Sequence, residues 1–430
     1  MVDETRARYL GPAGVLEKKR KYLVPCSYHF YAKPPQLVRG EMQYLWDSEG
    51  KRYLDFFAGV SVMACGHSNP TILEATIRQL RELQHATTIY LTQPIVDLAE
   101  RLASVLPGDI ERSFFCNSGS EANEGAFLLA RLHTGRHRVV SLERGLHGRT
   151  YLGMSATGLP MWRTDPRLDP AFAVVPGPFD AALRRTSPEA EARSLAAVER
   201  ELASGDVAAF IAEPIQGNGG IVVLPDDYLR ALRALTEARG VMLIADEVQT
   251  GFGRTGTLFA CERAGVVPDI ITMAKALGNG IPIAAYAAPD RIASSFTRPS
   301  ASTLGGNPVS CATALAVLDY IESEDLPGRA ARLGERLEAG LRDIASRRPR
   351  VAVVRGRGLM LGAELVDADG ESDPAAADAV LEFAKDSGLL VGKNGPDRNV
   401  LALQPPLVID EADVDLAIGI LDAAIARLEP

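Results

Sequence analysis

The order of apolar runs along the chain is the feature that most limits the folds this sequence can adopt. Between residues 70 and 325, short continuous apolar runs alternate with amphipathic stretches of helical periodicity. Continuous apolar strands are buried on both faces, so this alternation predicts an α/β fold with a mostly parallel central sheet flanked by helices. The predicted strands are 113–116, 139–141, 207–212, 241–245 and 270–273, and the predicted helices are 71–84, 94–105, 119–133, 226–239 and 308–322.

The two ends of the chain differ from this middle part. Two short strands flank a turn at 47–51, and a long helix follows Glu324-Asp325-Leu326-Pro327. With 430 residues the chain is long enough for two domains. We therefore predict a large ligand-binding domain at 70–325, a smaller α+β domain at 326–430, and an N-terminal segment at 1–69 that joins the smaller domain.

Charge and cysteine content argue against several classes of partner. The formal net charge is −9 and no block of Lys or Arg stands out, which argues against nucleic acid and against an anionic membrane. The stretch Met1–Arg6 has no apolar signal core, and no apolar run approaches the length of a membrane span. No C-x-x-C pair occurs, which argues against a disulfide framework or a bound metal and predicts a cytoplasmic protein. The five cysteines are Cys26, Cys65, Cys116, Cys261 and Cys311.

The turn Ser118-Gly119-Ser120 is the first of three polar stretches that follow predicted strands. In open α/β sheets, ligands bind outside the carboxyl ends of the strands. The turn opens the helix at 119–133, so the free N–H groups of that helix and its dipole favour an anion. No G-K-[ST] is present, which excludes a Walker loop. The alternative interpretation is an ordinary capped helix.

Asp246 ends the apolar run 241–245 and Lys275 follows the apolar run 270–273. A buried carboxylate is costly unless it meets a positive or proton-bearing partner, so Asp246 either caps a turn or faces a protonated ring nitrogen. A lysine at a core edge usually extends its amine to water. Burial among small residues instead lowers the pKa of the amine and frees it to form a Schiff base.

An anion site, a buried aspartate and a lysine at the ends of strands of one sheet match the needs of one cofactor. Pyridoxal 5′-phosphate requires a phosphate cradle, a partner for its pyridine nitrogen and a Schiff-base lysine. Asp246 would keep that nitrogen protonated, so that the ring can take up the electrons of a carbanion. The sequence therefore predicts pyridoxal 5′-phosphate as the cofactor.

The sequence resembles the class III pyridoxal-phosphate-dependent aminotransferases of fold type I over nearly its whole length. The most similar branch contains the alanine–glyoxylate and ω-amino-acid:pyruvate aminotransferases. Such enzymes transfer an amino group from a donor amine to a keto acid by a ping-pong mechanism. The motifs that carry the resemblance are 117–124, 147–150, 213–217, 246–254, Lys275 and 303–308.

The resemblance implies a role for each residue of these motifs. Lys275 would form the Schiff base and move the proton, and Asp246 would pair with the pyridine nitrogen. Gln249 would bond the ring hydroxyl, and Glu213 would support the hydrogen bonds beside the ring. The remaining cofactor-binding positions are Ser118, Gly119 and Ser120 at the phosphate, Leu146 and His147 at the ring, and Thr303, which would reach the phosphate of the neighbouring subunit. The implied assembly is a homodimer with shared active sites, or a tetramer.

Three positions depart from the family pattern. Leu146 stands where the family commonly has an aromatic residue stacked on the cofactor ring, a contact worth about 0.5–1.5 kcal/mol. Ala402 stands where many members have an arginine that binds the α-carboxylate of the substrate. Asn218 stands where ornithine-type members have a glutamate that neutralises this arginine. The absence of the glutamate at position 218 is consistent with the absence of the arginine at position 402, because there is no arginine whose charge would need to be neutralised.

The missing arginine predicts a donor without a bound α-carboxylate. An α-carboxylate without an arginine would lose a charge-assisted bidentate pair. Candidate donors are a simple amine, an amino-sugar or cyclitol carbon, or an ω-amino acid held by Arg149. The alternative is that Arg398 or Arg149 replaces the missing arginine. Tyr28, Phe30 and Tyr31 are expected at the substrate entrance, as N-terminal segments often are in this family.

The predicted function is a cytoplasmic aminotransferase with pyruvate, glyoxylate or 2-oxoglutarate as the acceptor. Amino-acid epimerases and amino-phosphate lyases of the same class need the same lysine, aspartate and phosphate cradle, so both remain alternatives. A non-catalytic binding protein on the same fold is a third alternative. The retention of Lys275, Asp246 and Gln249 argues against it.

Overall fold

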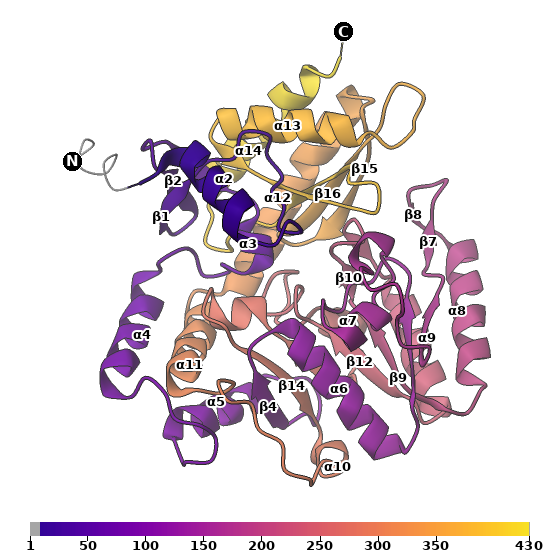
Figure 1. Cartoon of the computed structure of the whole chain (residues 1–430). Helices are drawn as coiled ribbons and strands as arrows, with labels where there is room; N and C mark the ends of the chain where they lie inside the picture. The colour runs from indigo at the N-terminus through magenta and orange to yellow at the C-terminus, as the bar shows by residue number, and fades with distance from the viewer. Residues whose placement is uncertain (1–8, 430) are drawn as a thin grey trace.

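The computed structural model describes residues 9–429. The stretch Met1–Arg6, discussed above for its lack of a signal core, lies outside the described residues. Two bodies share the chain: a large sheet with helices on both sides, and a smaller group of strands and helices that combines the two ends of the chain (Figure 1). Within residues 9–429, no helix has the length and apolar character needed to cross a membrane.

The large sheet has seven strands in the order β4-β14-β13-β12-β9-β5-β6. The strands are β4 (Arg112–Cys116), β5 (Arg138–Leu142), β6 (Phe172–Val175), β9 (Val207–Ala212), β12 (Met242–Asp246), β13 (Ile270–Met273) and β14 (Ala284–Ala288). All neighbours from β13 to β6 pair in parallel, whereas β14 is antiparallel to both β13 and β4. Because β14 is antiparallel to both of its neighbours, β4 runs in the same direction as β13. The strands β4, β12 and β13 therefore end at the same edge of the sheet.

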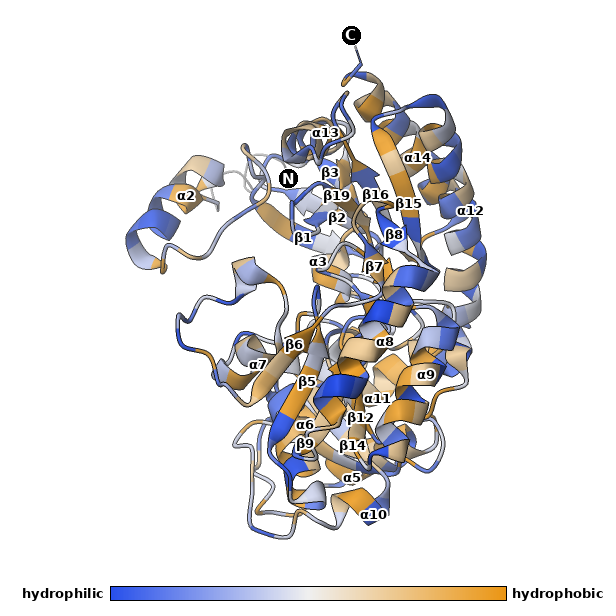
Figure 2. Ribbon diagram, turned by 90° about the vertical axis from the view of Figure 1, so that its right-hand side faces the viewer, coloured by the Kyte–Doolittle hydropathy of each residue, from blue (hydrophilic) through white to orange (hydrophobic). Residues whose placement is uncertain are grey.

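Helices cover both faces of this sheet because its strands are apolar on both sides. Every residue of β9 and β13 is buried. On one face, α6 (Gly119–Thr134) packs through Ala126, Phe127 and Ala130. On the other face, α8 (Pro188–Leu202) and α9 (Asp226–Ala238) pack against the sheet. Figure 2 shows the apolar strands enclosed by helices with polar outer faces. The prediction of a mostly parallel sheet flanked by helices is confirmed.

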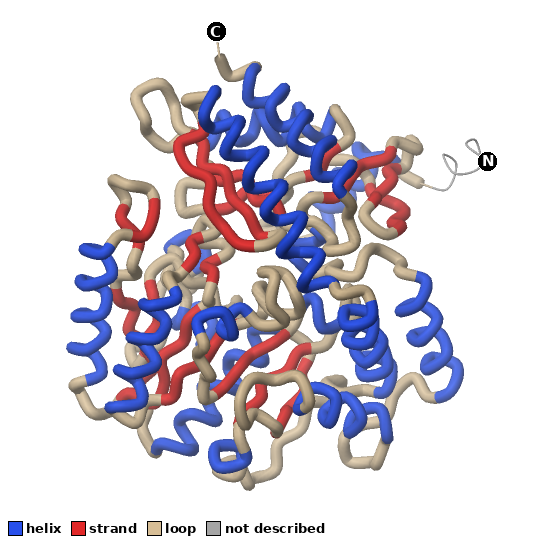
Figure 3. The backbone as a smooth tube through the Cα atoms, turned by 180° about the vertical axis from the view of Figure 1, so that it is seen from behind, coloured by secondary structure: helices blue, strands red, loops and turns tan. Residues whose placement is uncertain are grey.

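Two small sheets occupy the other end of the molecule (Figure 3). The C-terminal sheet has the order β15-β16-β19-β18 and the N-terminal sheet the order β1-β2-β3-β17. Their strands are β15 (Val351–Arg357), β16 (Met360–Leu365), β18 (Gly392–Asn394) and β19 (Val400–Leu403), then β1 (Leu37–Glu41), β2 (Tyr44–Asp47), β3 (Arg52–Asp55) and β17 (Leu389–Leu390). Since β17 pairs in parallel with β3, the two ends of the chain share a sheet.

The remaining helices surround these sheets and the edge of the large sheet. They include α4 (Pro70–Glu82), α5 (Gln93–Ala103), α11 (Pro308–Ser323), α12 (Leu326–Arg347), α13 (Pro374–Asp386) and α14 (Glu411–Ala426). The bounds of α4, α5 and α11 agree with the predicted helices to within two residues, and α12 is the long helix expected after residues 324–327. The helix α2 (Gly11–Tyr22) was not predicted; it has no buried residue and extends away from the body (Figure 2). The strands β6 and β14 of the large sheet were not predicted either.

Candidate active site

A cavity of about 570 Å³ opens at the carboxyl-terminal edge of the large sheet. Three strand ends contribute to its lining: the turn between β4 and α6, Asp246 at the end of β12, and Lys275 just after β13. Tyr28 and Phe30 of the N-terminal segment and Arg398 of the loop before β19 also line the cavity. The polar strand ends that the sequence singles out therefore meet in one cavity, in the usual place for ligands of open α/β sheets.

Asp246 is buried and held by two side chains from other elements. Its Oδ2 accepts hydrogen bonds from Asn123 Nδ2 on α6 (2.9 Å) and from His147 Nδ1 (2.8 Å). Its Oδ1 accepts the backbone N–H of Val248 (3.2 Å), so Asp246 does cap a turn as one interpretation proposed. A carboxylate oxygen accepts more than one hydrogen bond, so Oδ1 keeps the capacity to bind a protonated ligand atom.

Lys275 follows β13 in a left-handed backbone conformation, with φ of 46°. Such a conformation is unfavourable for a residue with a side chain and is typical of functional sites. Within residues 9–429, the Lys275 amine has neither a hydrogen-bond nor an ion-pair partner. Burial lowers the pKa of this amine, while the negative charges of Asp246 and Glu213 oppose the change. The net effect favours the neutral, nucleophilic form.

Close packing around the turn at the start of α6 requires glycine at two positions, Gly119 in the turn and Gly148 beside it. Ser118 is the N-cap of α6 and accepts the backbone N–H of Glu121 (3.3 Å), as in an ordinary capped helix. The same turn lines the cavity. A Cβ at Gly119 would lie 2.8 Å from Val248 Cγ1, and one at Gly148 would lie 2.7 Å from Ser120 Oγ. The backbone therefore approaches the cavity closely, at the positive end of a helix of 16 residues.

Glu213 and Gln249 lie behind the wall of the cavity. Glu213 accepts the backbone N–H groups of Leu146 (2.8 Å) and Gly217 (3.2 Å). Burial, together with the negative charge of Asp246, raises the pKa of Glu213. Gln249 Oε1 accepts a hydrogen bond from Gln404 Nε2 (2.8 Å). Leu146 itself lines the cavity.

The two arginines expected to bind substrate both line the cavity, but Ala402 does not. Ala402 lies on β19, is fully buried, and packs with Ile215, Ile221 and Met360. Within residues 9–429, neither Arg149 nor Arg398 forms an ion pair with a carboxylate. Both guanidiniums are therefore free to bind an anionic ligand.

An aromatic wall faces the strand ends across the cavity. The Arg398 guanidinium lies 5.1 Å from the ring centroid of Phe30 and 5.8 Å from that of Tyr28. The expected entrance residues Tyr28 and Phe30 line the cavity, whereas the Tyr31 hydroxyl donates to the carbonyl of Val391 (3.0 Å). Thr303 is exposed and lies outside the lining, so the predicted contact with a neighbouring subunit stays a prediction.

Sequence reasoning missed two groups of lining residues. Asn123 lies one helical turn after Gly119, so helical periodicity would have placed it on the same face of α6. Phe57 and Trp162 complete the aromatic wall, and no local pattern indicates their approach. Around the cavity, His147 Nε2 and Asn123 Oδ1 are buried without a partner among residues 9–429. Together with the free amine of Lys275 and the α6 N-terminus, these groups fit a polar, phosphate-bearing ring.

Comparison with known proteins identifies the family. The model of the family "Aminotransferase class-III" matches residues 31–425. The alanine–glyoxylate aminotransferase 2 homolog 2 of Arabidopsis thaliana, named as mitochondrial, is 41% identical over 426 residues, covering 98% of this chain and 89% of the relative. Several further relatives are named acetylornithine aminotransferases, one from Streptomyces clavuligerus being 43% identical over 396 residues, which cover 91% of this chain and 92% of the relative.

Two solved structures have nearly the same fold. An amine transaminase from an uncultivated Pseudomonas species, in its PLP-bound form, is 33% identical with a TM-score of 0.88 and covers 95% of this chain and 98% of its own. A phospholyase from Arthrobacter in complex with phosphoethanolamine is 35% identical with a TM-score of 0.89 and covers 96% of this chain and 99% of its own.

Proposed function

Because this chain belongs to the class III aminotransferases, which depend on pyridoxal 5′-phosphate, we propose that it uses an amine or ω-amino donor. The acceptor is a keto acid such as pyruvate, glyoxylate or 2-oxoglutarate, and the two half-reactions follow a ping-pong order. The observation that carries the proposal is at position 402, where the family resemblance leads us to expect an arginine and the chain has a fully buried alanine.

Ala402 lies outside the lining of the cavity, so position 402 contributes no guanidinium to it. Ala402 has no polar atom in its side chain, and Asn218 on the cavity wall supplies no acid. An α-carboxylate beside the reacting amine would therefore find no charge-assisted partner on β19. Arg149 and Arg398 lie elsewhere on the lining, so a carboxylate remote from the amine would meet a guanidinium. This geometry favours a simple amine or an ω-amino acid as the donor.

The residues of the cavity divide the work of catalysis among them. Lys275 Nζ, which burial favours in its neutral form, would bind the cofactor and would take the proton from the substrate carbon that carries the amine. Asp246, oriented by Asn123 and His147, would hold a proton at the ring nitrogen. The bound cofactor supplies an electron sink for the carbanion.

The rest of the cavity holds the cofactor in place. The backbone N–H groups of Ser118, Gly119 and Ser120 would bind its phosphate, and Leu146 and His147 would contact its ring. Gln249 and Glu213 would order the hydrogen bonds beside the ring. Tyr28 and Phe30, which also line the cavity, would help to exclude water.

Exposed apolar side chains at 89–96 and at 304 support a homodimer with shared sites. Ile89, Tyr90, Leu91, Val96 and Leu304 are each more than half exposed. Apolar surface of this kind is typical of a subunit interface. Thr303 is adjacent to Leu304 and would reach the phosphate of the neighbouring subunit. Analytical ultracentrifugation tests this: a monomer at micromolar concentration contradicts it.

A reducing compartment, the cytoplasm, is part of the same proposal. The cysteines Cys26, Cys65, Cys116, Cys261 and Cys311 are all free thiols, and four of them are buried. Free thiols of this kind persist where the surroundings are reducing.

A second candidate function is an amino-phosphate lyase. The Arthrobacter phospholyase is 35% identical to this chain. The two unpaired guanidiniums of Arg149 and Arg398 suit a phosphate as well as a carboxylate. The same lysine and aspartate would serve that reaction.

Visible absorbance of the purified holoenzyme distinguishes these functions. Alanine, glutamate, β-alanine, 4-aminobutyrate, a simple primary amine, an amino-sugar and phosphoethanolamine are added one at a time. We expect a simple amine or an ω-amino acid to bleach the cofactor band and a keto acid to restore it. Bleaching by alanine as fast as by β-alanine contradicts the proposed donor. Phosphate release from phosphoethanolamine without a keto acid identifies the lyase.

A further inference from the structure

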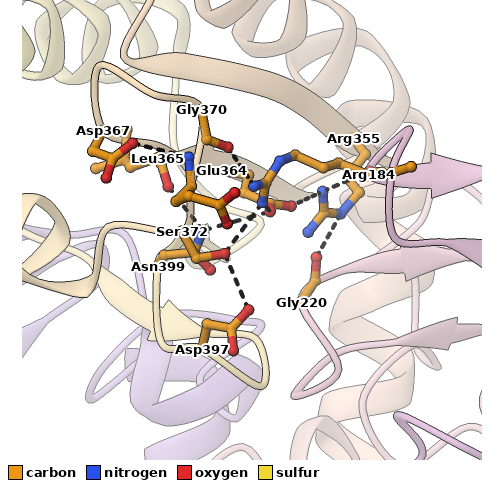
Figure 4. Close-up of polar contacts among 12 residues, drawn as sticks. Arg184, Gly220, Arg355, Glu364, Leu365, Asp367, Gly370, Ser372, Asp397 and Asn399 are labelled. Carbon is orange, nitrogen blue, oxygen red and sulfur yellow. Dashed lines mark hydrogen bonds and ion pairs between the residues drawn. The ribbon is translucent and has the colours of Figure 1, made fainter.

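A partly buried cluster of charged side chains lies beside Asp397 and Asn399, the two neighbours of Arg398 in the chain (Figure 4). At its centre, Glu364 on β16 is buried, with both carboxylate oxygens engaged. Its Oε1 accepts from Arg184 Nη1 (2.5 Å) and its Oε2 from Arg355 Nη1 (2.6 Å). Burial opposes ionisation of Glu364, but the two guanidiniums outweigh it, so the pKa of this carboxyl is lowered. The cluster is therefore charged at neutral pH.

Arg184 brings the large sheet's periphery into contact with the C-terminal sheet. It lies between β7 (Phe179–Asp180) and β8 (Arg185–Thr186), in a left-handed conformation with φ of 53°. Besides Glu364, its guanidinium donates to Ser372 Oγ (3.2 Å) and to the carbonyl of Gly370 (2.6 Å). Arg184 therefore connects the segment between β7 and β8 to β16 and to the loop at 370–372, which are remote from it in sequence.

Arg355 and Arg144 extend the cluster to the glycine turn at 217–220. Arg355 Nε donates to the carbonyl of Gly220 (2.7 Å), and Arg144 Nη1 donates to that of Gly219 (3.2 Å). The Arg144 guanidinium also stacks 3.9 Å from the ring centroid of Phe179. These hydrogen bonds restrict the backbone conformation of the glycine turn at 217–220.

The loop at 395–399 is attached to this cluster on both sides of Arg398. Before it, the backbone N–H of Gly395 donates to the carbonyl of Asn218 (3.1 Å). After it, Asn399 Nδ2 donates to the carbonyl of Leu365 (2.8 Å) and to Glu364 Oε1 (3.5 Å). Ser372 Oγ donates to Asp397 Oδ2 (3.1 Å).

Arg398 itself needs such support. Its φ is 60°, a conformation that costs about 1 kcal/mol or more for a non-glycine residue and persists when the surroundings hold it. The neighbours of Arg398 in the chain are hydrogen-bonded to the cluster, while the Arg398 guanidinium itself lines the cavity and lies over the ring of Phe30.

We propose that Glu364, with Arg184 and Arg355, positions Arg398 for carboxylate binding without touching the substrate. The inference rests on the proposed function, in which Arg398 binds a carboxylate remote from the reacting amine. A displacement of about 1 Å at such a contact changes rates by up to about a hundredfold. The cluster thus determines which donors the enzyme accepts, from a position outside the cavity.

The test compares 4-aminobutyrate with butylamine, which has the same chain length without the carboxylate. Apparent dissociation constants are read from the absorbance of the cofactor in the holoenzyme. We expect Glu364→Gln to weaken 4-aminobutyrate about tenfold and to change butylamine less than about twofold, by loss of an oriented charge-assisted contact. Equal effects on both ligands, or no effect on either, overturn the inference.

Two further variants separate positioning from folding. Because Glu364→Gln leaves two guanidiniums without their shared carboxylate, it can unfold the protein; Ser372→Ala loosens the same loop without burying a charge and is expected to weaken 4-aminobutyrate about threefold. Asp226→Asn is the matched control, since Asp226 accepts from Arg357 Nη1 (2.7 Å) across the same two parts of the molecule but does not contact the loop. A selective loss of 4-aminobutyrate binding in Asp226→Asn overturns the inference.

Arg398→Ala tells a failed inference from a failed function. If Arg398→Ala leaves the binding of 4-aminobutyrate unchanged, the role of Arg398 in the proposed function is wrong. If it weakens binding while Glu364→Gln and Ser372→Ala do not, the positioning role alone is wrong. In the Arg398→Ala background, Glu364→Gln is expected to have no further effect on 4-aminobutyrate.

Discussion

Replacement of Asn123 by alanine separates the orientation of Asp246 from the stability of the fold. Asn123 is almost fully buried on α6, and its Nδ2 donates to the carbonyl of His147 (2.7 Å) and to Asp246 Oδ2 (2.9 Å). The first bond is neutral and contributes about 1 kcal/mol, and the second reaches a carboxylate and contributes about 1.5–3 kcal/mol. We therefore expect Asn123→Ala to lower the free energy of unfolding by about 3 kcal/mol.

The same change should weaken the binding of the cofactor. His147 Nδ1 remains as a donor to Asp246 Oδ2 and the backbone N–H of Val248 as a donor to Oδ1, so the carboxylate stays in the cavity but is oriented by fewer bonds. The loss of one charge-assisted bond predicts a cofactor affinity lower by about tenfold to a hundredfold. Urea unfolding of the apoprotein measures the stability, and titration of the visible absorbance measures the affinity.

Asn69→Ala is the matched control. Asn69 is also buried, donates to the carbonyl of Cys65 (2.8 Å) and accepts the N–H of Thr71 (3.0 Å), but it does not line the cavity. It should lose a similar amount of stability and keep its affinity for the cofactor. If Asn123→Ala behaves like Asn69→Ala in both assays, Asn123 serves the fold alone and our reading of the site is refuted.

Three further predictions concern the wall of the cavity. A Cβ at Gly217 would overlap Gln249 Oε1, so Gly217→Ala should displace that amide and weaken cofactor binding about tenfold in the same titration; unchanged binding would remove Gln249 from the site. The pKa of Glu213 is raised from 4.5 to about 7, so the folded apoprotein binds more protons than the unfolded chain in this range. The stability that this group contributes is present at acidic pH and is lost as the pH rises towards about 7, and Glu213→Gln should remove this slope from urea unfolding curves. Leu146→Phe should raise cofactor affinity up to about tenfold through ring stacking, and weaker binding would show that the cavity has no room for a ring there.

The convergence of the polar strand ends could be predicted because it follows from strand direction. Apolar runs that end in Asp246 and before Lys275 indicate parallel strands, and parallel strands end at one edge. The turn at Ser118 reaches the same edge for a reason that the sequence did not reveal. Its strand β4 is separated from β13 by β14, and two antiparallel pairings restore its direction. The fold class could therefore be predicted from the sequence, whereas the position of β14 between β13 and β4 could not.

The opposite wall could not be predicted, because it is built from contacts between distant segments. Arg398 reaches the cavity owing to bonds from its loop to Asn218 and Ser372, each more than 20 residues away in sequence. Tyr28 and Phe30 approach from the N-terminal segment without any periodic signal. Sequence periodicity indicates which face of its own helix or strand a residue occupies. The residues of this wall come together through packing between separate elements, which periodicity does not indicate.

Arginine at position 402 is the change that the family comparison suggests, and the structure predicts that it fails by itself. Ala402 lies in the middle of the C-terminal sheet, opposite Gly362 and Gly392, and its side chain is fully buried against Ile221 and Met360. A guanidinium there would be buried without an acid, at a cost of about 3–5 kcal/mol. We expect Ala402→Arg to lower the midpoint of thermal unfolding and to leave alanine and glutamate as poor donors. A stable variant that turns over alanine faster would show that position 402 does reach the cavity. Donor choice would then depend on that single residue, and not on the walls that carry Arg149 and Arg398.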